Sequence, residues 1–342
     1  MAEARKVVLI PGDGIGPEIT EAVKQIMAAA DARVVWVDRL AGQSALDAGE
    51  NVLPDSTVEA IRTHDIALKG PCTTPVGTGF SSVNVALRRT LDAYAAVRPV
   101  RSMPGVETPF RNVDLVIIRE NTEGLYSGQE NAIAPGVVTS LKVATAKACR
   151  RIAKWAFDYA VSRNRRKVTV FHKANIMKIT DGLFLECARE VRESYSAVEY
   201  EEVIIDAGCM KIVQNPGQFD VLLLENLYGD IVSDLCAGLV GGLGVIPGAN
   251  IGDRYAVFEA VHGTAPDIAG KGIANPLGLL MSAVMMLNHL AETEQRSELQ
   301  TAAERIKNAY NAALAAGDMT GDIGGSLDTN QFTQVVIDRL EP

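Results

Sequence analysis

Short runs of Val, Ile and Leu alternate along the chain with longer segments of helical periodicity, and this alternation restricts the fold more than any other feature. The runs lie at residues 6–10, 66–69, 115–119, 168–172, 221–224 and 257–259. Strands that alternate with helices form a mainly parallel sheet with helices on its faces. Ligands of such sheets bind beyond the strand ends. We therefore predict an α/β fold, with the functional site at the polar residues that follow several strands.

The length and composition indicate a globular protein of about two domains. The chain has 342 residues, of which 47% are hydrophobic and 22% charged, a balance typical of folded proteins. Its net charge of -9 argues against nucleic-acid binding, which needs a positive surface. The longest apolar stretch, residues 277–287, is shorter than the roughly 20 residues that cross a bilayer. We expect neither a nucleic-acid nor a membrane partner.

The cysteines and the first residues bear on the cellular compartment. Cys72, Cys149, Cys187, Cys209 and Cys236 are widely spaced and lack the paired spacing of zinc sites or redox disulfides. We expect them to be reduced thiols in the core. The first residues enter a strand pattern without a signal-peptide core or a transit segment. We therefore predict a cytoplasmic protein, although a mature mitochondrial protein would look the same.

Gly12, Gly14 and Gly16 follow the first predicted strand, where many nucleotide-binding proteins carry the sequence GxGxxG. The spacing here is GxGxG, and Pro17 follows at the expected helix start. A tight strand-to-helix turn explains the glycines equally well. The segment is therefore weak evidence for a dinucleotide site.

The glycine-rich loop at residues 73–82 has the composition of an anion site. It leads into a predicted helix, and helix N-termini attract anions. Asn84 and Arg88 are four residues apart and share one face of that helix. Arg98 and Arg119 follow on or near strands, and arginines bind carboxylates with paired hydrogen bonds. A set of surface salt bridges is the alternative, and this segment alone does not separate the two.

Asp230 and Asp234 lie four residues apart on another predicted helix, where like charges repel each other. A divalent cation would remove the repulsion, and oxygen ligands suit Mg²⁺ or Mn²⁺. Asp206, which ends the strand-like run 201–206, is a third candidate ligand. Aspartates on a solvated helix surface are the alternative.

Two further segments follow predicted strands and carry polar side chains. Lys173 and Asn175 come directly after one strand, and a buried lysine near other cations can transfer protons. A structural lysine is the alternative. Residues 259–276 form a second glycine-containing loop after a strand, which could wrap a nucleotide. His262 within this loop could equally be an ordinary turn or core residue.

Taken together, these motifs resemble the β-decarboxylating dehydrogenases, the family of isocitrate, isopropylmalate, homoisocitrate and tartrate dehydrogenases. The matching segments are IPGDGIGPE at 10–18, RENTE at 119–123, HKANIM at 172–177 and DIGG at 322–325. The resemblance implies the family's fold, which is not a Rossmann fold and has two interleaved α/β domains. Residues 1–94 and 250–342 would form a large cofactor-binding domain, and residues 95–249 a small domain with the dimer interface.

The resemblance also implies a role for each matching position. The acid and base would be Tyr126 and Lys173. The substrate would be bound by Thr74, Ser82, Asn84, Arg88, Arg98, Arg119 and Asn175. Mg²⁺ or Mn²⁺ would be held by Asp206, Asp230 and Asp234. The cofactor would be bound by Glu259, His262, Gly263, Thr264, Ala265, Asp267, Ile268, Asn275 and Asp322.

The implied reaction is the oxidative decarboxylation of isocitrate to 2-oxoglutarate and CO₂. Isopropylmalate enzymes carry an apolar patch before the position of Arg88, whereas Ser82 and Asn84 offer hydrogen bonds to an extra carboxylate. Either Lys173 or Asp206 would take the first proton. Homoisocitrate or tartrate dehydrogenase is the alternative enzyme. A regulatory subunit of a hetero-oligomeric enzyme is the non-catalytic alternative, although such subunits lose some site residues.

The resemblance further implies NAD as the cofactor and a homodimer with shared active sites. NADP-dependent relatives carry lysine and tyrosine at the positions of Asp267 and Ile268, and tyrosine and arginine at those of Gly321 and Gly325. Asp267 would bind ribose hydroxyls and repel a 2'-phosphate. Each site would combine residues of one chain with Lys173 and other residues of a two-fold-related partner.

Overall fold

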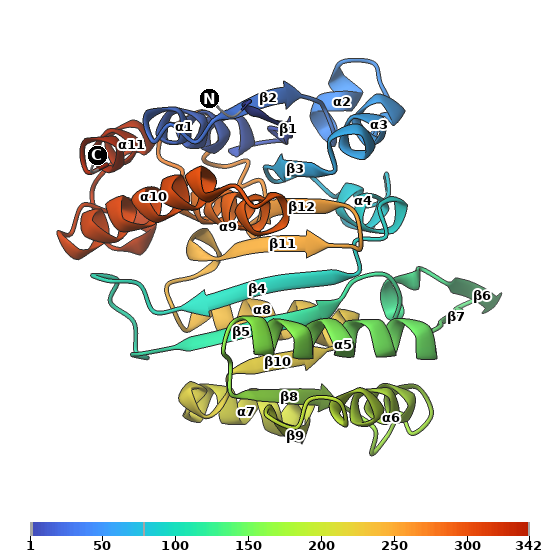
Figure 1. Ribbon diagram of the computed structural model, residues 1–342. Coiled ribbons are helices and arrows are strands. Elements are labelled where there is room, and N and C mark those ends of the chain that lie inside the picture. Colours follow the sequence, from blue (N-terminus) through green and yellow to red (C-terminus); the bar gives the residue numbers. More distant parts are fainter. Residues whose placement is uncertain (1–2, 78, 341–342) are drawn as a thin grey trace.

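The computed structural model describes residues 3–77 and 79–340, and in this part of the chain ten strands form one continuous sheet (Figure 1). Their order is β2-β1-β3-β12-β11-β4-β5-β10-β8-β9. These strands are β1 (Arg5–Ile10), β2 (Val34–Asp38), β3 (Ile66–Lys69), β4 (Ala95–Arg101), β5 (Asp114–Glu120), β8 (Lys167–His172), β9 (Glu199–Ile204), β10 (Val221–Leu224), β11 (Pro247–Ile251) and β12 (Ala256–Ala260). A separate hairpin consists of β6 (Glu130–Ala134) and β7 (Val137–Ser140).

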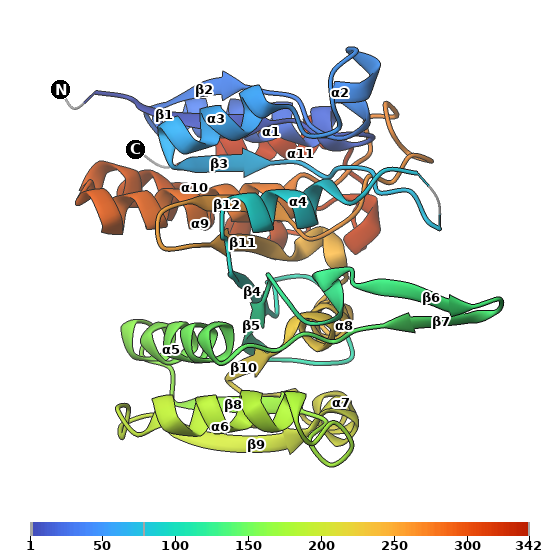
Figure 2. The same cartoon turned by 90° about the vertical axis from the view of Figure 1, so that its right-hand side faces the viewer.

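Helices cover both faces of the sheet (Figures 1 and 2). The α-helices are α1 (Gly16–Ala29), α2 (Gln43–Asp47), α3 (Asp55–His64), α4 (Val83–Thr90), α5 (Ala146–Ser162), α6 (Thr180–Arg192), α7 (Ile205–Gln214), α8 (Asn226–Gly238), α9 (Leu277–Glu294), α10 (Ser297–Ala315) and α11 (Thr329–Asp338). Short 3-10 helices are η1 (Leu125–Ser127), η2 (Pro216–Gln218), η3 (Leu243–Val245) and η4 (Gly321–Ile323). Within the described ranges, no helix has the length and apolarity that a membrane crossing would need.

The predicted α/β class is confirmed, and each predicted apolar run lies in a strand. One boundary was wrong. The run 201–206 was expected to end at Asp206, but β9 ends at Ile204 and Asp206 lies in the first turn of α7. A carboxylate in the first turn of a helix interacts favourably with the helix dipole, which accounts for the earlier start of the helix.

The direction of the strands reverses in the middle of the sheet. β11 runs antiparallel to both of its neighbours, β12 and β4, and β4 is antiparallel to β5. Strands on either side of this central set pair in parallel. The sheet is therefore continuous across the expected domain boundaries, which fall before β4 and within β11; the division into domains stays a prediction.

The register of the central strands gives the sheet two chemically different faces. Glu259 of β12 is paired with Gly248 of β11, and Asn250 with Ala96 of β4. Because successive strand residues point to opposite faces, Glu259, Asn250 and Arg98 share one face, which we call the front face. Phe258, Ala249 and Val97, which pair with one another along the sheet, share the rear face.

The glycines after β1 are explained by close backbone packing. A Cβ atom on Gly12 would lie 2.1 Å from the carbonyl oxygen of Pro71, and one on Gly14 would lie 2.1 Å from that of Thr264. Both glycines also have positive φ angles, +79° and +59°, which favour glycine. Between them, the buried Asp13 carboxylate accepts hydrogen bonds from the backbone N–H groups of the first two residues of α2 and of Thr73 in the loop after β3. The turn after β1 therefore holds the start of α2 and the loop after β3 in place.

Gly208→Ala is expected to lower the stability of the protein, since its Cβ would lie 2.5 Å from the Phe171 ring, where α7 meets β8. Overpacking of this kind costs roughly 1–3 kcal/mol. Gly182→Ala in α6 is the matched control, because the added Cβ would meet none of the described atoms within 4 Å. Alanine is otherwise favoured over glycine in helices by about 1 kcal/mol. Thermal unfolding should show a lower midpoint for Gly208→Ala only, and equal midpoints would contradict the close approach.

Candidate active site

A cavity of about 390 Å³ opens over the front face of the central strands, between α4 and α8. It brings together many of the residues that the sequence predicted for the site. These are Thr74, Ser82, Asn84, Arg88, Arg98, Arg119, Tyr126, Asp230, Asp234, Glu259, His262 and Gly263. Segments that are far apart in the sequence therefore meet at one place, which we call the front cavity.

Helix α4 presents the first group of polar side chains to the front cavity. Ser82 caps the helix by accepting the Val85 N–H at 3.5 Å, and Asn84 and Arg88 follow on one helical face. The Asn84 Oδ1 and Arg88 Nε atoms are buried and have no hydrogen-bond partner among the described residues. Buried polar atoms normally have partners, so these two are available to a bound ligand.

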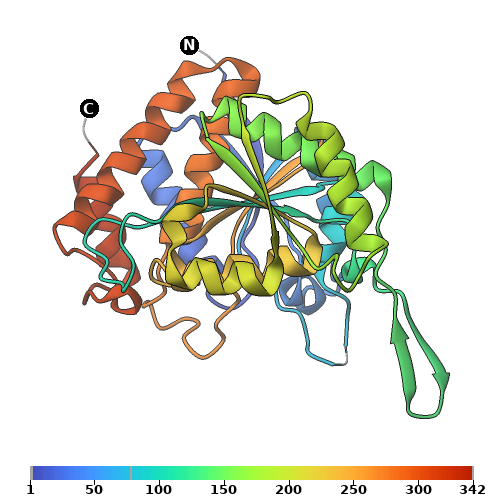
Figure 3. The same cartoon turned by 90° about the horizontal axis from the view of Figure 1, so that it is seen from below.

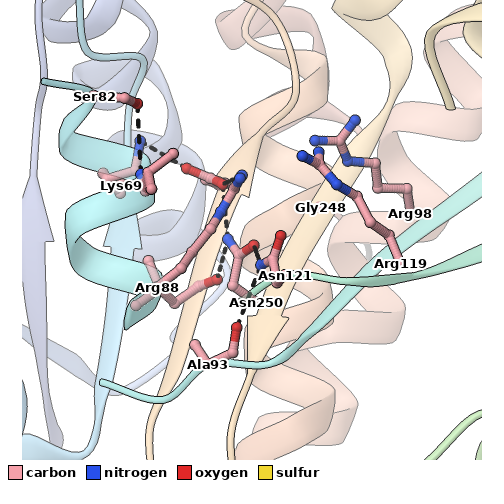
Figure 4. Close-up of polar contacts among 12 residues, drawn as sticks. Lys69, Ser82, Arg88, Ala93, Arg98, Arg119, Asn121, Gly248 and Asn250 are labelled. Carbon is pink, nitrogen blue, oxygen red and sulfur yellow. Dashed lines mark hydrogen bonds and ion pairs between the residues drawn. The ribbon is translucent and has the colours of Figure 1, made fainter. Parts of the chain in front are cut away.

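Arg98 and Arg119 form the cationic floor of the front cavity. They extend from the neighbouring strands β4 and β5, and Figure 4 shows their side chains lying together. Both are buried, at 8% and 1% exposure. Burial, and then repulsion from other arginines, lowers the pKa of both guanidinium groups. An anion with several carboxylates would relieve this repulsion.

Helix α8 supplies the negative charges opposite the arginines. Asp230 accepts hydrogen bonds from Arg119 and from the Tyr126 hydroxyl, and its carboxylate lies 3.5 Å from Arg98. Asp234, one turn later, lies 3.6 Å from Arg98. Burial alone would raise the pKa of Asp230, but Arg119 and Arg98 outweigh it and lower that pKa. Burial raises the pKa of Asp234.

The same helix offers two of the three oxygen ligands expected for Mg²⁺ or Mn²⁺. The Asp230 and Asp234 carboxylates both face the front cavity, and carboxylate oxygen is the donor that these cations prefer. Across the described residues of this single chain, no group of three or more His, Cys, Asp or Glu side chains converges as a metal site. The donor chemistry of these two carboxylates fits such a cation.

A buried ion-pair network supports the arginine side of the front cavity. The Glu259 carboxylate lies 2.7 Å from Lys69 Nζ and 3.0 Å from Arg88, and it accepts a hydrogen bond from Asn250 at 2.7 Å (Figure 4). Burial alone would raise the pKa of Glu259, but the two cations lower it. Asn250 also accepts from Asn121 at 2.8 Å. Glu259 therefore fixes Arg88 and Lys69, and both its oxygens are already engaged.

Lys69 was missed by the sequence reasoning. It is 2% exposed, lines the front cavity and ends β3, whose other residues are all buried and apolar. A charged residue that ends a buried apolar strand was the available signal, because strand ends form the ligand crevice of α/β sheets. Burial would lower the pKa of Lys69, and the charge of Glu259 raises it.

Lys173, Asn175 and Asp206 lie outside the front cavity of their own chain. Lys173 Nζ is 2.6 Å from the Asp206 carboxylate, and this hydrogen bond lowers the pKa of Asp206. The Lys173 backbone N–H donates to Asp181 at 2.7 Å, and Asp181 is held in turn by Lys142 at 2.6 Å. The predicted catalytic lysine is thus fixed in place, but away from the arginines.

The predicted cofactor residues fall into two groups. His262 and Gly263 reach the front cavity, whereas Thr264, Ala265, Asp267 and Ile268 continue along the loop after β12. Asn275 donates a hydrogen bond to Asp322 of η4 at 3.0 Å, which joins the end of this loop to the 322–325 motif.

Two features of this region suit a nucleotide cofactor. Nε2 of His262 is buried without a partner among the described residues, and burial lowers the pKa of the ring. The neutral imidazole can therefore bind a ligand. Asp267 is exposed at the turn after this segment, where its carboxylate can accept hydrogen bonds from hydroxyl groups.

The cysteines take no part in the front cavity beyond Cys72, which lies at its wall. All five cysteines are free, and all except Cys209, which is partly exposed, are buried, as predicted for reduced core thiols. Burial raises the pKa of Cys149 and of Cys236 to about 12 each. Such thiols are poor nucleophiles because the thiolate is the reactive form.

Comparison with known proteins gives relatives along almost the whole chain. The sequence is 51% identical to the mitochondrial "Isocitrate dehydrogenase [NAD] catalytic subunit 5" of Arabidopsis thaliana, over 97% of this chain and 87% of the relative. It is 50% identical to the chloroplastic 3-isopropylmalate dehydrogenase of Solanum tuberosum, over 91% and 86%. The crystal structure of isocitrate dehydrogenase from Methylococcus capsulatus superimposes with a TM-score of 0.93 at 46% identity, covering 99% and 100%.

The family model described as isocitrate/isopropylmalate dehydrogenase matches residues 6–338. This match agrees with the α/β architecture, with the front cavity and with the solved structure of similar fold. The chain therefore belongs to the isocitrate/isopropylmalate dehydrogenase family.

Proposed function

We propose that the protein is an NAD-dependent isocitrate dehydrogenase that converts isocitrate to 2-oxoglutarate and CO₂. The observation that carries the proposal is the front cavity, where Arg88, Arg98 and Arg119 gather opposite two aspartates. Isocitrate has three carboxylates, and clustered arginines bind such anions well. Ser82 and Asn84 add hydrogen-bonding groups where an isopropyl group would need apolar contacts. The chain is 51% identical to an isocitrate dehydrogenase subunit and 50% identical to a 3-isopropylmalate dehydrogenase. Overall identity therefore does not separate the two substrates, and the choice rests on Ser82 and Asn84.

In the proposed mechanism, the three arginines bind and orient the substrate carboxylates, and Asp230 and Asp234 would hold Mg²⁺ or Mn²⁺. When bound, the cation would polarise the oxygen on C2, and NAD would accept the hydride. One member of the Lys173–Asp206 pair takes the hydroxyl proton. Tyr126 then protonates the carbon that has lost CO₂. Burial raises the pKa of Tyr126 and its hydrogen bond to Asp230 raises it further, which suits a proton donor.

The choice of NAD rests on the environment of the cofactor loop. Asp267 would accept hydrogen bonds from ribose hydroxyls and repel a 2'-phosphate, and Ile268 offers no hydrogen bond. A Cβ atom on Gly325 would lie 1.9 Å from the Met319 carbonyl oxygen. This backbone therefore leaves no room for a phosphate-binding arginine at position 325.

A homodimer with shared sites would bring the separated residues together. Lys173 and Asp206 are flanked by apolar side chains that are unusually exposed: Ile176 at 69%, Ile179 at 86% and Met210 at 50%. The β6–β7 hairpin projects from the body (Figures 2 and 3). An isolated hairpin is only marginally stable in water, and exposed apolar groups mark interaction surfaces. Both features support an interface with a second copy.

We also propose a division of the chain into two domains and a cellular compartment for the protein. Residues 1–94 and 250–342 would act as the cofactor-binding domain, and 95–249 as the domain with the dimer interface. A cytoplasmic location is proposed from the sequence pattern, whereas the Arabidopsis relative is named as mitochondrial. Fractionation of the source cells would separate these two locations.

The purified chain alone is expected to reduce NAD with isocitrate and Mn²⁺ or Mg²⁺, and EDTA should abolish the activity. NADH absorbance measures the reaction. A panel of isocitrate, homoisocitrate, isopropylmalate and tartrate tests the substrate. Isocitrate should have the highest kcat/KM. A higher value for any other acid would overturn the reading of Ser82 and Asn84, and no activity would favour a regulatory subunit.

NAD should be preferred to NADP by at least ~100-fold in kcat/KM, since several unmatched interactions at ~1 kcal/mol each multiply. The double variant Asp267→Lys with Ile268→Tyr should narrow this ratio. Asp338→Lys with Ile337→Tyr, a pair with the same residue changes at the end of α11, serves as the control and should not. A wild-type enzyme that prefers NADP would refute the cofactor assignment.

Shared sites are tested with Lys173→Met and Asp230→Asn, each expected to be nearly inactive alone. Unfolded and refolded together in equal amounts, about half of the dimers should be mixed, and each mixed dimer would hold one intact site. Roughly a quarter of the wild-type activity should return. Each variant refolded alone is the control. Mixed dimers that recover no activity would show that each site is built within one chain.

A further inference from the structure

A second cavity, of about 450 Å³, lies on the rear face of the sheet, and we call it the rear cavity. Its sheet residues are Val97, Pro99, Ala249, Ile251 and Phe258. They alternate along the strands with Arg98, Asn250 and Glu259 of the front face, so the two cavities lie on opposite faces of the same strands. Helices α5 and α9, which lie over this face in Figure 1, form the sides.

Aromatic rings line the rear cavity on both sides. Trp155 and Tyr159 of α5 are stacked, with ring centroids 5.4 Å apart and an interplanar angle of 20°. On the other side, Phe258 and His289 have centroids 5.6 Å apart. A cavity of this volume with aromatic walls and a few polar groups is typical of small-molecule sites. Flat aromatic ligands gain most from such walls, because ring pairs prefer offset-stacked or edge-on contacts.

The walls also carry polar groups that the protein leaves unused. The Trp155 indole N–H, the Tyr159 hydroxyl, the Asn288 amide and the His289 ring make no hydrogen bond to another residue of the described chain. None of these polar groups is fully buried. Burial lowers the pKa of His289, so its ring is neutral and offers one donor and one acceptor. A ligand with matching nitrogen or oxygen atoms could replace water at these positions.

The charged side chains at the rim of the rear cavity already form ion pairs with one another or with neighbours. These pairs indicate whether the ligand itself is charged. Arg163, directly after α5, forms two hydrogen bonds with Glu292 of α9, at 2.6 and 2.8 Å. Asp158 is paired with Lys154 at 2.6 Å. No unpaired side-chain charge among the described lining residues would favour an anion or a cation. A neutral ligand fits this rim, because it needs no counter-charge.

We propose that the rear cavity is a binding site for a neutral, planar, bicyclic heteroaromatic compound. The ligand stacks against the Trp155–Tyr159 pair and exchanges hydrogen bonds with Asn288 and His289. This site is separate from the front cavity, and the proposal does not depend on the reaction that occurs there.

Benzimidazole, in a buffer that keeps it uncharged, is the probe for this site. Trp36 and Trp155 are the two tryptophans of the chain, and Trp36 lies on β2 at the far edge of the sheet. In Trp36→Phe protein, emission therefore reports on Trp155 alone. A saturable change in emission with added benzimidazole is expected. No saturable change up to the solubility limit of the probe would overturn the proposal.

Asn288→Phe should fill the rear cavity and raise the Kd for benzimidazole at least ~10-fold. Asn308→Phe, the same substitution on the exposed surface of α10, is the matched control and should leave the Kd unchanged. If Asn288→Phe fails to fold, Asn288→Ala should still raise the Kd about threefold through the lost hydrogen bond. An unchanged Kd in the folded Asn288 variant would refute the site, as would competition by excess NAD.

Discussion

The burial of several positive charges around one cavity is the constraint on which the rest of this structure depends. Lys69, Arg88, Arg98 and Arg119 are all less than 10% exposed. A buried charge is unfavourable unless an opposite charge and hydrogen bonds accompany it. Glu259 meets this need for Lys69 and Arg88, and Asp230 meets it for Arg119. The cavity keeps its cations ready for an anion because the Glu259 and Asp230 carboxylates hold them.

The reversal of strand direction makes this arrangement possible. β4 and β11 lie at the centre of the sheet and run antiparallel to their neighbours. They bring Arg98 and Asn250 beside Arg119 of β5 and Glu259 of β12, although these residues are far apart in sequence. The Asn121–Asn250 hydrogen bond also connects β11 with the end of β5.

The sequence predicts the outer parts of this fold better than its centre. Residues 66–68 and 221–224 are continuously apolar and lie in buried strands, which is the pattern that parallel strands produce. β11 contains Pro247, Gly248 and Asn250, so it has no apolar run by which to recognise it. β4 is similarly interrupted by Arg98 and Pro99. The central strands carry site residues on their front face and core residues such as Val97 and Ala249 on their rear face, so neither strand has an unbroken apolar run.

The site residues show the same division. Spacing along helices correctly grouped Asn84 with Arg88 and Asp230 with Asp234, because helical geometry is local. The convergence of these groups on Arg98 and Arg119 depends on pairing between distant strands, which spacing cannot give. Only the resemblance to a family brought those segments into one predicted site. The roles of Lys173 and Asp206, which lie elsewhere in their own chain, still depend on that resemblance.

The position of β12 between β3 and β11 has a consequence for the folding of the chain during its synthesis on the ribosome. Residues 114–224 contain β5, β8, β9 and β10, so this half of the sheet can assemble while the chain is still growing. β3 is made much earlier, yet the edge of β3 that pairs with β12 stays unpaired until residues 256–260 have been made. An exposed strand edge is prone to aggregation. This edge of β3 is therefore open to pairing with other chains while residues 70–255 are being synthesised.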